Sequence, residues 1–471
     1  MTETASPPGT LSARTRRIAL LAGPIAAVAA GLALRGAGFE DGAAITLGVT
    51  VLCVVWWVLQ PIPIPATSLV PLAVLPMCGV LPMEKTSASY GHPLVLLLLG
   101  GFILSTAMAK SGAHRRIALT MVKIFGGNSS RQLVFGFMAA AAVLSMWISN
   151  TATTLMLLPV ALAVLERAKD PKLAIPLLLG IAHAASVGGI GTPIGTPPNV
   201  VFMAVYEETT GNSISFTDWM LMAVPVVVLF LPLMGLWLTR HLKSTGQAPV
   251  ALPEVGEWRP EEKRVMTIFG LTALAWVTRK EPFGGWSGLL DLPYSNDAMV
   301  AFFAVVAMFI VPNGKGGKLL DWETAADIPW GMLILFGAGL AIASAFSATG
   351  LSTAIGESLS AVSIWPMLAV IFAICLAVTF LTEATSNTAT TSLLMPVLAA
   401  TALAAAIDPK LLMVPAAMSA SCAFMLPVAT APNVVVFSSG KVPPTSMARE
   451  GFALNLIGAV VITLVCYTLV V

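Results

Sequence analysis

The chain has 471 residues, of which 57% are hydrophobic and only 10% are charged. Soluble globular proteins carry roughly 25% charged residues, and a mean hydropathy of +0.88 points the same way. This composition excludes a soluble enzyme and a disordered scaffold. Its 25 basic and 23 acidic residues give a net charge of +2 and leave no basic domain to bind nucleic acid. The sequence predicts an integral membrane protein.

Eleven apolar stretches approach the roughly 20 residues that a helix needs to cross a bilayer. The first is interpreted as a retained span and not as a signal peptide, because Arg35 closes it where a cleavage site would have small residues. The predicted spans are 18–34, 43–59, 66–81, 93–109, 172–189, 219–242, 265–277, 298–311, 330–349, 411–425 and 452–471. Two further apolar regions, 133–165 and 364–406, have polar residues at their centres and are predicted to be re-entrant hairpins.

Most lysines and arginines fall on one side of the membrane in this predicted topology. Cytoplasmic connections are expected to be the basic ones, and they contain Arg14, Arg16, Arg17, Lys110, Arg115, Arg116, Lys123, Arg131, Arg167, Lys169, Lys172, Arg240, Lys243, Arg259, Lys263, Arg264, Lys315, Lys318, Lys441 and Arg449. The external connections contain Arg35, Lys85, Arg279, Lys280 and Lys410. The N-terminus is therefore predicted to be cytoplasmic and the C-terminus external, in a multi-pass protein of the inner (plasma) membrane.

The five cysteines lie in apolar stretches and form neither CxxC pairs nor metal-ligand spacings. No disulfide framework is expected, and each cysteine is predicted to be buried as a packing residue. They are Cys53, Cys78, Cys375, Cys422 and Cys466.

A polar motif occurs twice in this apolar chain. The six residues SNTATT at 149–154 recur at 386–391, and a proline follows each motif, at Pro159 and Pro396. DPK at 170–172 is echoed at 408–410, and TPPNVV at 196–201 is echoed by TAPNVV at 430–435. Each half thus contains a hairpin followed by a helix that Gly, Pro and Asn break. Because the two hairpins are predicted to enter from opposite sides, the halves form an inverted repeat, which is typical of secondary transporters.

The broken helices indicate a site for cations and an anion together. Unwound carbonyls and the Asn side chains can bind a hard cation such as Na⁺, while the helix N-termini that follow favour an anion. No Lys or Arg occurs in 145–165, 180–203, 380–403 or 411–440, so an anion is expected to rely on dipoles, hydroxyls, amides and bound cations. His183 is interpreted as a hydrogen-bonded helix residue, with a proton or substrate role as the alternative. Glu383 is interpreted as a supporting residue rather than a direct ligand.

The two SNT hairpins, the stretch GGIGTPIGTPPN at 188–199 and the stretch FMLPVATAPN at 424–433 resemble the divalent anion/sodium symporter family. This family comprises solute carrier family thirteen and its bacterial dicarboxylate relatives, and the resemblance runs from about Trp56 to the C-terminus. It implies an all-α protein with eleven transmembrane helices and two re-entrant hairpins. It also implies a homodimer and an elevator mechanism. Relatives often have an acid in the motif where this chain has Gln60, which is expected to lie outside the site. Ala431 stands where dicarboxylate carriers commonly have proline.

The resemblance also implies the ligands of the site. One sodium ion would be held by Ser145, Ser149, Asn150 and Gly195, and a second by Thr382, Thr385, Asn387 and Ala429. Substrate carboxylates would contact Asn150, Thr151, Thr196, Asn387, Thr388, Thr430 and Ala431.

The expected organisation is a cytoplasmic tail (1–17), scaffold helices (18–110), a first transport region (111–215), further scaffold (216–350), a second transport region (351–445) and a last helix (446–471). The expected function is sodium-coupled symport of C4-dicarboxylates such as succinate, malate and fumarate. Dicarboxylate exchange without net sodium movement, transport of citrate or sulfate, and an ion channel are the alternatives. An enzyme is not expected, because no HExxH motif, carboxylate pair or nucleophile–base spacing occurs.

Overall fold

The structure, a computed structural model, describes residues 13–126, 129–168, 171–242, 256–281, 283–358 and 365–470. Most of the predicted tail, and Lys169, Asp170 and Lys243, lie outside these residues. The described chain is helical, and its only β contact is an isolated bridge between Pro312 and Lys318. Its helices are α1 (Ala13–Gly36), α2 (Asp41–Leu59), α3 (Ile64–Thr67), α4 (Val70–Met77), α5 (Met83–Tyr90), α6 (Pro93–Ser111), α7 (Ala113–Phe125), α8 (Ser130–Ser145), α9 (Asn150–Arg167), the 3₁₀ turn η1 (Pro171–Leu173), α10 (Ala174–Ile190), α11 (Pro197–Thr210), α12 (Phe216–Leu238), α13 (Pro260–Val277), α14 (Gly285–Leu289), α15 (Asp297–Ile310), α16 (Trp322–Ala326), α17 (Trp330–Ala348), α18 (Leu351–Ser358), α19 (Met367–Ala384), α20 (Asn387–Ala404), α21 (Lys410–Ser419), α22 (Ala431–Phe437) and α23 (Pro444–Val470).

Eight helical segments of the described chain are long and apolar enough to cross a membrane. They are α1, α2, the segment Met83–Ser111 that contains α5 and α6, α12, α17, α19, α20 and α23. Four other predicted spans correspond to apolar helical segments of 10–17 residues, namely Ile64–Met77 (which contains α3 and α4), α10, α15 and α21. A multi-pass membrane protein is therefore confirmed, and several of its helices are shorter than a bilayer is thick.

Two predicted spans are interrupted in the structure, so the prediction of continuous helices there was wrong. The stretch 66–81 divides into α3 and α4, because Ser68 caps the first helix and the second begins at Val70 with Pro71 in its first turn. The stretch 411–425 is helical only to Ser419, and an irregular segment follows to Thr430. This irregular segment contributes to the site described below.

The cysteine prediction holds at four of the five positions. Cys53, Cys375, Cys422 and Cys466 are buried, and all five thiols are free. Cys78 is exposed, because it caps the short helix α4 at the outside of the bundle.

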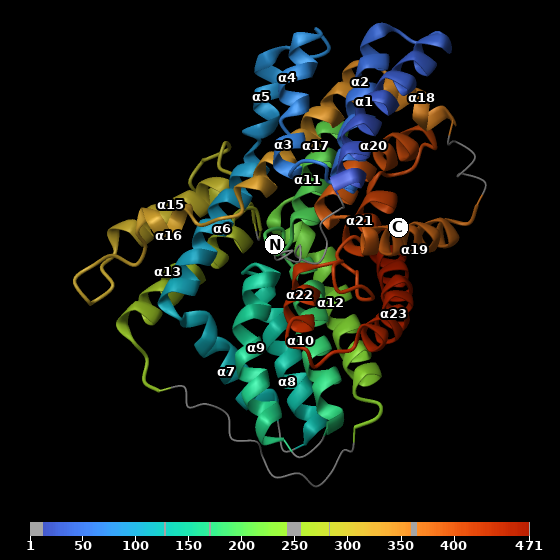
Figure 1. The fold of residues 1–471 in the computed structure, drawn as a ribbon. Coiled ribbons are helices and arrows are strands. Elements are labelled where there is room, and N and C mark those ends of the chain that lie inside the picture. The colour runs from blue at the N-terminus through green and yellow to red at the C-terminus, as the bar shows by residue number, and fades with distance from the viewer. Residues whose placement is uncertain are drawn as a thin grey trace, which may run out of the picture.

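Both predicted hairpins are helix–turn–helix units. α8 and α9 are joined by residues 146–149, and α19 and α20 by residues 385–386. The helix after the break in each half packs against the hairpin of the other half. α11 of the first half contacts α20 of the second, and α22 of the second contacts α9 of the first. In Figure 1, α8 and α9 extend to the bottom of the molecule, whereas α20 lies in its upper part, and α11 and α22 lie between them. The two halves therefore contact each other through equivalent elements.

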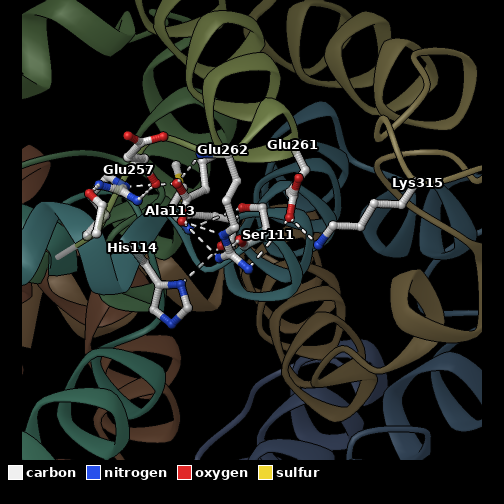
Figure 2. A network of polar contacts seen from close by, with 11 residues as sticks. Ser111, Ala113, His114, Glu257, Glu261, Glu262 and Lys315 are labelled. Carbon is white, nitrogen blue, oxygen red and sulfur yellow. Dashed lines mark hydrogen bonds and ion pairs between the residues drawn. The ribbon is translucent and has the colours of Figure 1, made fainter.

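A buried polar network fixes the junction of α6 and α7 to the start of α13 (Figure 2). The Arg116 side chain donates to Glu262 Oε2 at 2.8 Å and to the Gly256 carbonyl at 3.0 Å. Arg259 donates to Glu262 Oε1 and to the Ser111 carbonyl, both at 2.8 Å. Because Arg116 is buried and Glu262 is its carboxylate partner, removing Glu262 would leave an uncompensated charge and cost about 3–5 kcal/mol. Removing Arg116 should cost less, because Glu262 keeps its ion pair with Arg259.

Candidate functional site

One cavity of about 1060 Å³ lies between the two hairpins and the two helix breaks. It is lined by residues from both halves and from the region between α1 and α3. The lining residues are Arg16, Val58, Leu59, Gln60, Ile62, Pro63, Phe102, Ser149, Asn150, Thr151, Ser186, Gly195, Thr196, Pro197, Pro329, Met332, Glu383, Ala384, Thr385, Ser386, Asn387, Thr388, Val428, Ala429, Thr430, Ala431 and Pro432.

Four helices begin at this cavity. α9 starts at Asn150, α11 at Pro197, α20 at Asn387 and α22 at Ala431, and all four of these residues are part of the lining. A helix N-terminus presents unpaired N–H groups and about half a positive charge. Their convergence makes the cavity attractive to an anion with more than one carboxylate-like group.

The turn of the first hairpin places its Asn side chain against a serine from the preceding helix. Ser145 Oγ donates to Asn150 Oδ1 at 2.5 Å. The Ser149 side chain caps α9 by accepting from the Ala152 N–H at 3.4 Å. Thr192, in the break that follows α10, donates to the Met146 carbonyl and so ties the break to the hairpin turn.

The second hairpin repeats the main contact at the same spacing. Thr382 Oγ1 donates to Asn387 Oδ1 at 3.0 Å and lies 3.1 Å from the Ala420 carbonyl oxygen. Thr385 Oγ1 donates to the Leu381 carbonyl and lies 2.5 Å from Thr390 Oγ1. In both halves, a hydroxyl five residues before the SNT asparagine therefore orients its amide.

Each helix break is held by the asparagine that follows it. Asn199 Nδ2 lies within hydrogen-bonding distance of the carbonyl oxygens of Gly189, Ile190 and Thr192, the shortest contact being 2.7 Å. Asn433 Nδ2 lies 3.0 Å from the carbonyl oxygens of Ala423 and Leu426. These amides satisfy carbonyls that the broken helices leave unpaired, as backbone at membrane depth requires.

The structure brings together nearly all of the predicted site residues. Every predicted sodium or substrate ligand lines the cavity except two, Ser145 and Thr382. These two are fully buried behind the turns, where they contact the Asn150 and Asn387 side chains. They can therefore orient the amides of the two turns.

Glu383 supports the second helix break through four hydrogen bonds. Its Oε1 accepts from the N–H groups of Phe424 and Met425 at 2.7 and 2.9 Å and from Asn455 Nδ2 at 2.8 Å, while its Oε2 accepts from the Leu426 N–H at 3.0 Å. The interpretation as a supporting residue agrees with this geometry. The first half has Met146 at the equivalent position, three residues before its serine, so the carboxylate belongs to one half alone.

Three polar residues outside the two hairpins were not expected in the cavity. Gln60 was expected outside the site, but it lines the cavity together with its neighbours Leu59 and Ile62. Arg16 also lines it, which corrects the expectation that no Lys or Arg would face the site. Ser186 adds a hydroxyl that is 2% exposed and has no partner among the described residues.

His183 does not have the hydrogen bonds that were expected for it. Its side chain is completely buried, and neither ring nitrogen has a partner among the described residues. The ring packs against Phe424 with 4.8 Å between centroids and does not line the cavity. The expectation of a hydrogen-bonded residue was wrong because α10 is covered here by an aromatic side chain.

Residues 15–470 match the family model described as the sodium:sulfate symporter transmembrane region. The chain belongs to this sodium:sulfate symporter family. The family resemblance that the SNT motifs carried is thereby confirmed. The match extends through both helix breaks and both hairpins, so the whole cavity lies within the region that this symporter family shares.

Curated relatives of the chain are named as transporters. The sodium-dependent dicarboxylate transporter SdcS of Staphylococcus saprophyticus is 39% identical over 476 residues, covering 96% of this chain and 91% of the relative. SdcS of Staphylococcus aureus strain NCTC 8325 is 39% identical over 444 residues, covering 89% and 85%.

Two solved structures share the fold at low sequence identity. The Alcanivorax borkumensis YdaH transporter has a TM-score of 0.59 at 15% identity, over 83% of this chain and 86% of that one. Neisseria gonorrhoeae MtrF has a TM-score of 0.54 at 13% identity, over 82% and 83%. At this identity they show the fold alone and carry no information on the substrate.

Proposed function

We propose that this protein is a secondary transporter that couples sodium to the movement of C4-dicarboxylates such as succinate, malate and fumarate. The observation that carries the proposal is one cavity in which four helix N-termini meet the two SNT turns. The N-termini suit two carboxylates, and the Asn oxygens with unwound carbonyls suit sodium. The names of the SdcS relatives support the same substrate and ion.

The sodium ions would bind at the two turns. The first would take Ser145, Ser149, Asn150 and Gly195, and the second Thr382, Thr385, Asn387 and Ala429. Asn150 and Asn387 would contact both ion and substrate. In support, each side chain is oriented by a hydroxyl at its own turn and also lines the cavity. Carboxylates would contact these amides together with Thr151, Thr196, Thr388, Thr430 and the N-terminus of α22 at Ala431.

We expect the affinity for succinate to rise steeply with sodium concentration. A dianion is costly at membrane depth, and the partial charges of helix N-termini fall off within one turn, so two bound sodium ions would supply full positive charges beside it. By reciprocity, succinate should increase the affinity for sodium by the same factor. Calorimetry of succinate binding to the purified protein at several sodium concentrations, with choline replacing sodium, measures this coupling.

A succinate affinity independent of sodium would contradict symport and favour the exchanger. Sulfate and citrate added as competitors in the same titration test the remaining substrates of the family. Saturable uptake of labelled succinate into proteoliposomes would distinguish a carrier from a channel.

We also propose the architecture that the family resemblance implies. The chain would form a homodimer in the inner membrane, with eleven crossings, two re-entrant hairpins and an elevator mechanism. The scaffold would be 18–110 and 216–350, and the moving regions 111–215 and 351–445, which contain the hairpins and breaks. The reciprocal packing of α11 with α20 and of α22 with α9 would join the moving regions as one unit.

The inverted topology predicts opposite sides for two equivalent lysines. Lys172 and Lys410 each follow a hairpin in an Asp-Pro-Lys motif. Single cysteines at these positions, in a protein whose native cysteines are replaced, should react with a membrane-impermeant thiol reagent from opposite sides of the membrane. Reaction of both from one side would show that the number of crossings between them is wrong.

A further inference from the structure

We propose that Arg16 attracts the substrate dianion to the mouth of the cavity on the side of the membrane where α1 begins, which the predicted topology makes the cytoplasmic side, and so sets the concentration at which transport from that side saturates. This inference deepens the proposed function and depends on it, because it assumes that a dicarboxylate binds in this cavity. It adds to the site a residue about 130 positions away from the first SNT motif, at the start of α1.

Arg16 is held at the cavity by the loop between α2 and α3. Its Nε donates to the Pro61 carbonyl at 2.7 Å, and the neighbours of Pro61, Gln60 and Ile62, line the same cavity as Arg16. Gln60 ends α2 in a left-handed conformation, with φ 46° and ψ 48°. This conformation is uncommon for a residue with a side chain, and it turns the chain so that Pro61 faces the start of α1.

The charges on the lining make Arg16 available to an anion. Among the described lining residues, Arg16 and Glu383 are the ones with ionised side chains. Glu383 is buried and its carboxylate accepts four hydrogen bonds, so its charge is already satisfied. Arg16 is exposed and makes no ion pair with an acid in the described part of the chain. Its positive charge is therefore left to attract an anion from solution.

An exposed arginine at the mouth should act on encounter more than on tight binding. A charge in a cleft with low-dielectric walls raises the local concentration of counter-ions, and added salt screens this effect. The attraction on a dianion is twice that on a monoanion at the same distance. Removing the charge should therefore raise the apparent KM for succinate offered at the cytoplasmic face and leave the maximal rate nearly unchanged.

The test compares Arg16→Gln with Arg17→Gln in proteoliposomes. Arg17 is the adjacent exposed arginine, and it does not line the cavity. In Arg16→Gln, the KM for succinate supplied at the cytoplasmic face at low ionic strength should rise about 3- to 10-fold, and its dependence on salt should become weaker. The KM for succinate supplied at the external face should stay unchanged. Arg17→Gln should behave as the wild type, and Arg16→Lys should restore the low KM. Equal KM values and equal salt dependence in both glutamine variants would overturn the proposal.

A second measurement changes the charge within one folded protein. Arg16→Cys, combined with Cys78→Ser to remove the exposed native thiol, is labelled in detergent and then reconstituted. A methanethiosulfonate reagent with a trimethylammonium group should lower the KM, and one with a sulfonate group should raise it. The same reagents on Arg17→Cys provide the control, and adducts of either sign with the same KM on Arg16→Cys would refute the assignment.

An error in the proposed function can be distinguished from an error in this inference. If the wild-type protein shows no sodium-dependent uptake of succinate, the proposed function is wrong. If the wild type transports succinate but the charge at position 16 has no effect on KM, only the role of Arg16 is wrong.

Discussion

Asn150→Ala and Asn387→Ala are each expected to reduce sodium-driven succinate uptake by about 100-fold or more, since each removes hydrogen bonds or ligands to charged groups. In the proposed site, each amide contacts a sodium ion and a carboxylate, and no other side chain occupies its place in the turn. The fold should survive, because both residues are partly exposed to the cavity and begin their helices rather than fill the core. Uptake into proteoliposomes and the elution volume of the purified variants measure the two effects.

Asn212→Ala is the matched control, because Asn212 lies exposed in the loop between α11 and α12. It should transport as the wild type does. Wild-type uptake with unchanged sodium dependence in either Asn150→Ala or Asn387→Ala would refute the assignment of the two turns.

Glu383→Gln should give the second large effect, on stability and on sodium affinity together. The glutamine amide would place N–H groups against at least one backbone N–H of the 424–426 segment, where the carboxylate now accepts. Each buried donor left without an acceptor costs about 1–3 kcal/mol. The break that carries Ala429 and Thr430 should then loosen, and the second sodium site with it. Thermal unfolding and sodium titration of the purified protein test this expectation.

Two further variants distinguish the effect of the Glu383 charge from the effect of its hydrogen bonds. Glu383→Asp keeps the charge but withdraws the carboxylate by one carbon, so the backbone contacts should weaken while the negative charge remains. Asn455→Ala removes one of the four donors and should give a smaller loss of stability. Exposed Glu323→Gln is the control. A Glu383→Gln protein with wild-type melting temperature and sodium affinity would contradict the supporting role.

The sequence predicted the centre of the site well because the chain repeats it. Asn150 and Asn387 could be identified by identical polar neighbours in an apolar background. Such a duplication is visible in the sequence without any knowledge of the fold. Arg16 and Gln60 could not be placed in the same way, because their position depends on how the loop after α2 packs against α1. Gln60 differs from the acid that relatives often have at this position, which marked the residue as unusual. Only the fold shows that Gln60 lines the cavity.

The helix limits were predicted less well where tertiary contacts decide them. Apolar composition continues past Ser419, yet the backbone leaves the helix there because Asn433 and Glu383 provide partners for the unwound groups. Periodicity cannot detect such partners, since Glu383 lies about 40 residues before the segment that it holds. For the same reason, the sequence suggested hydrogen bonds for His183 where the structure has an aromatic ring.

The shortness of α21 has an electrical consequence. Its ten residues span about 15 Å, half of a hydrocarbon layer of about 30 Å. In the proposed transporter, an ion that enters along this helix and binds at its end would therefore cross at most about half of the membrane potential. A full crossing changes the energy of one elementary charge by about 2.3 kcal/mol per 100 mV. Crossing half of the potential then changes the energy of each ion by about 1.2 kcal/mol per 100 mV, which is roughly a sevenfold change in apparent sodium affinity. Binding from one side should therefore depend on voltage even before any part of the protein moves.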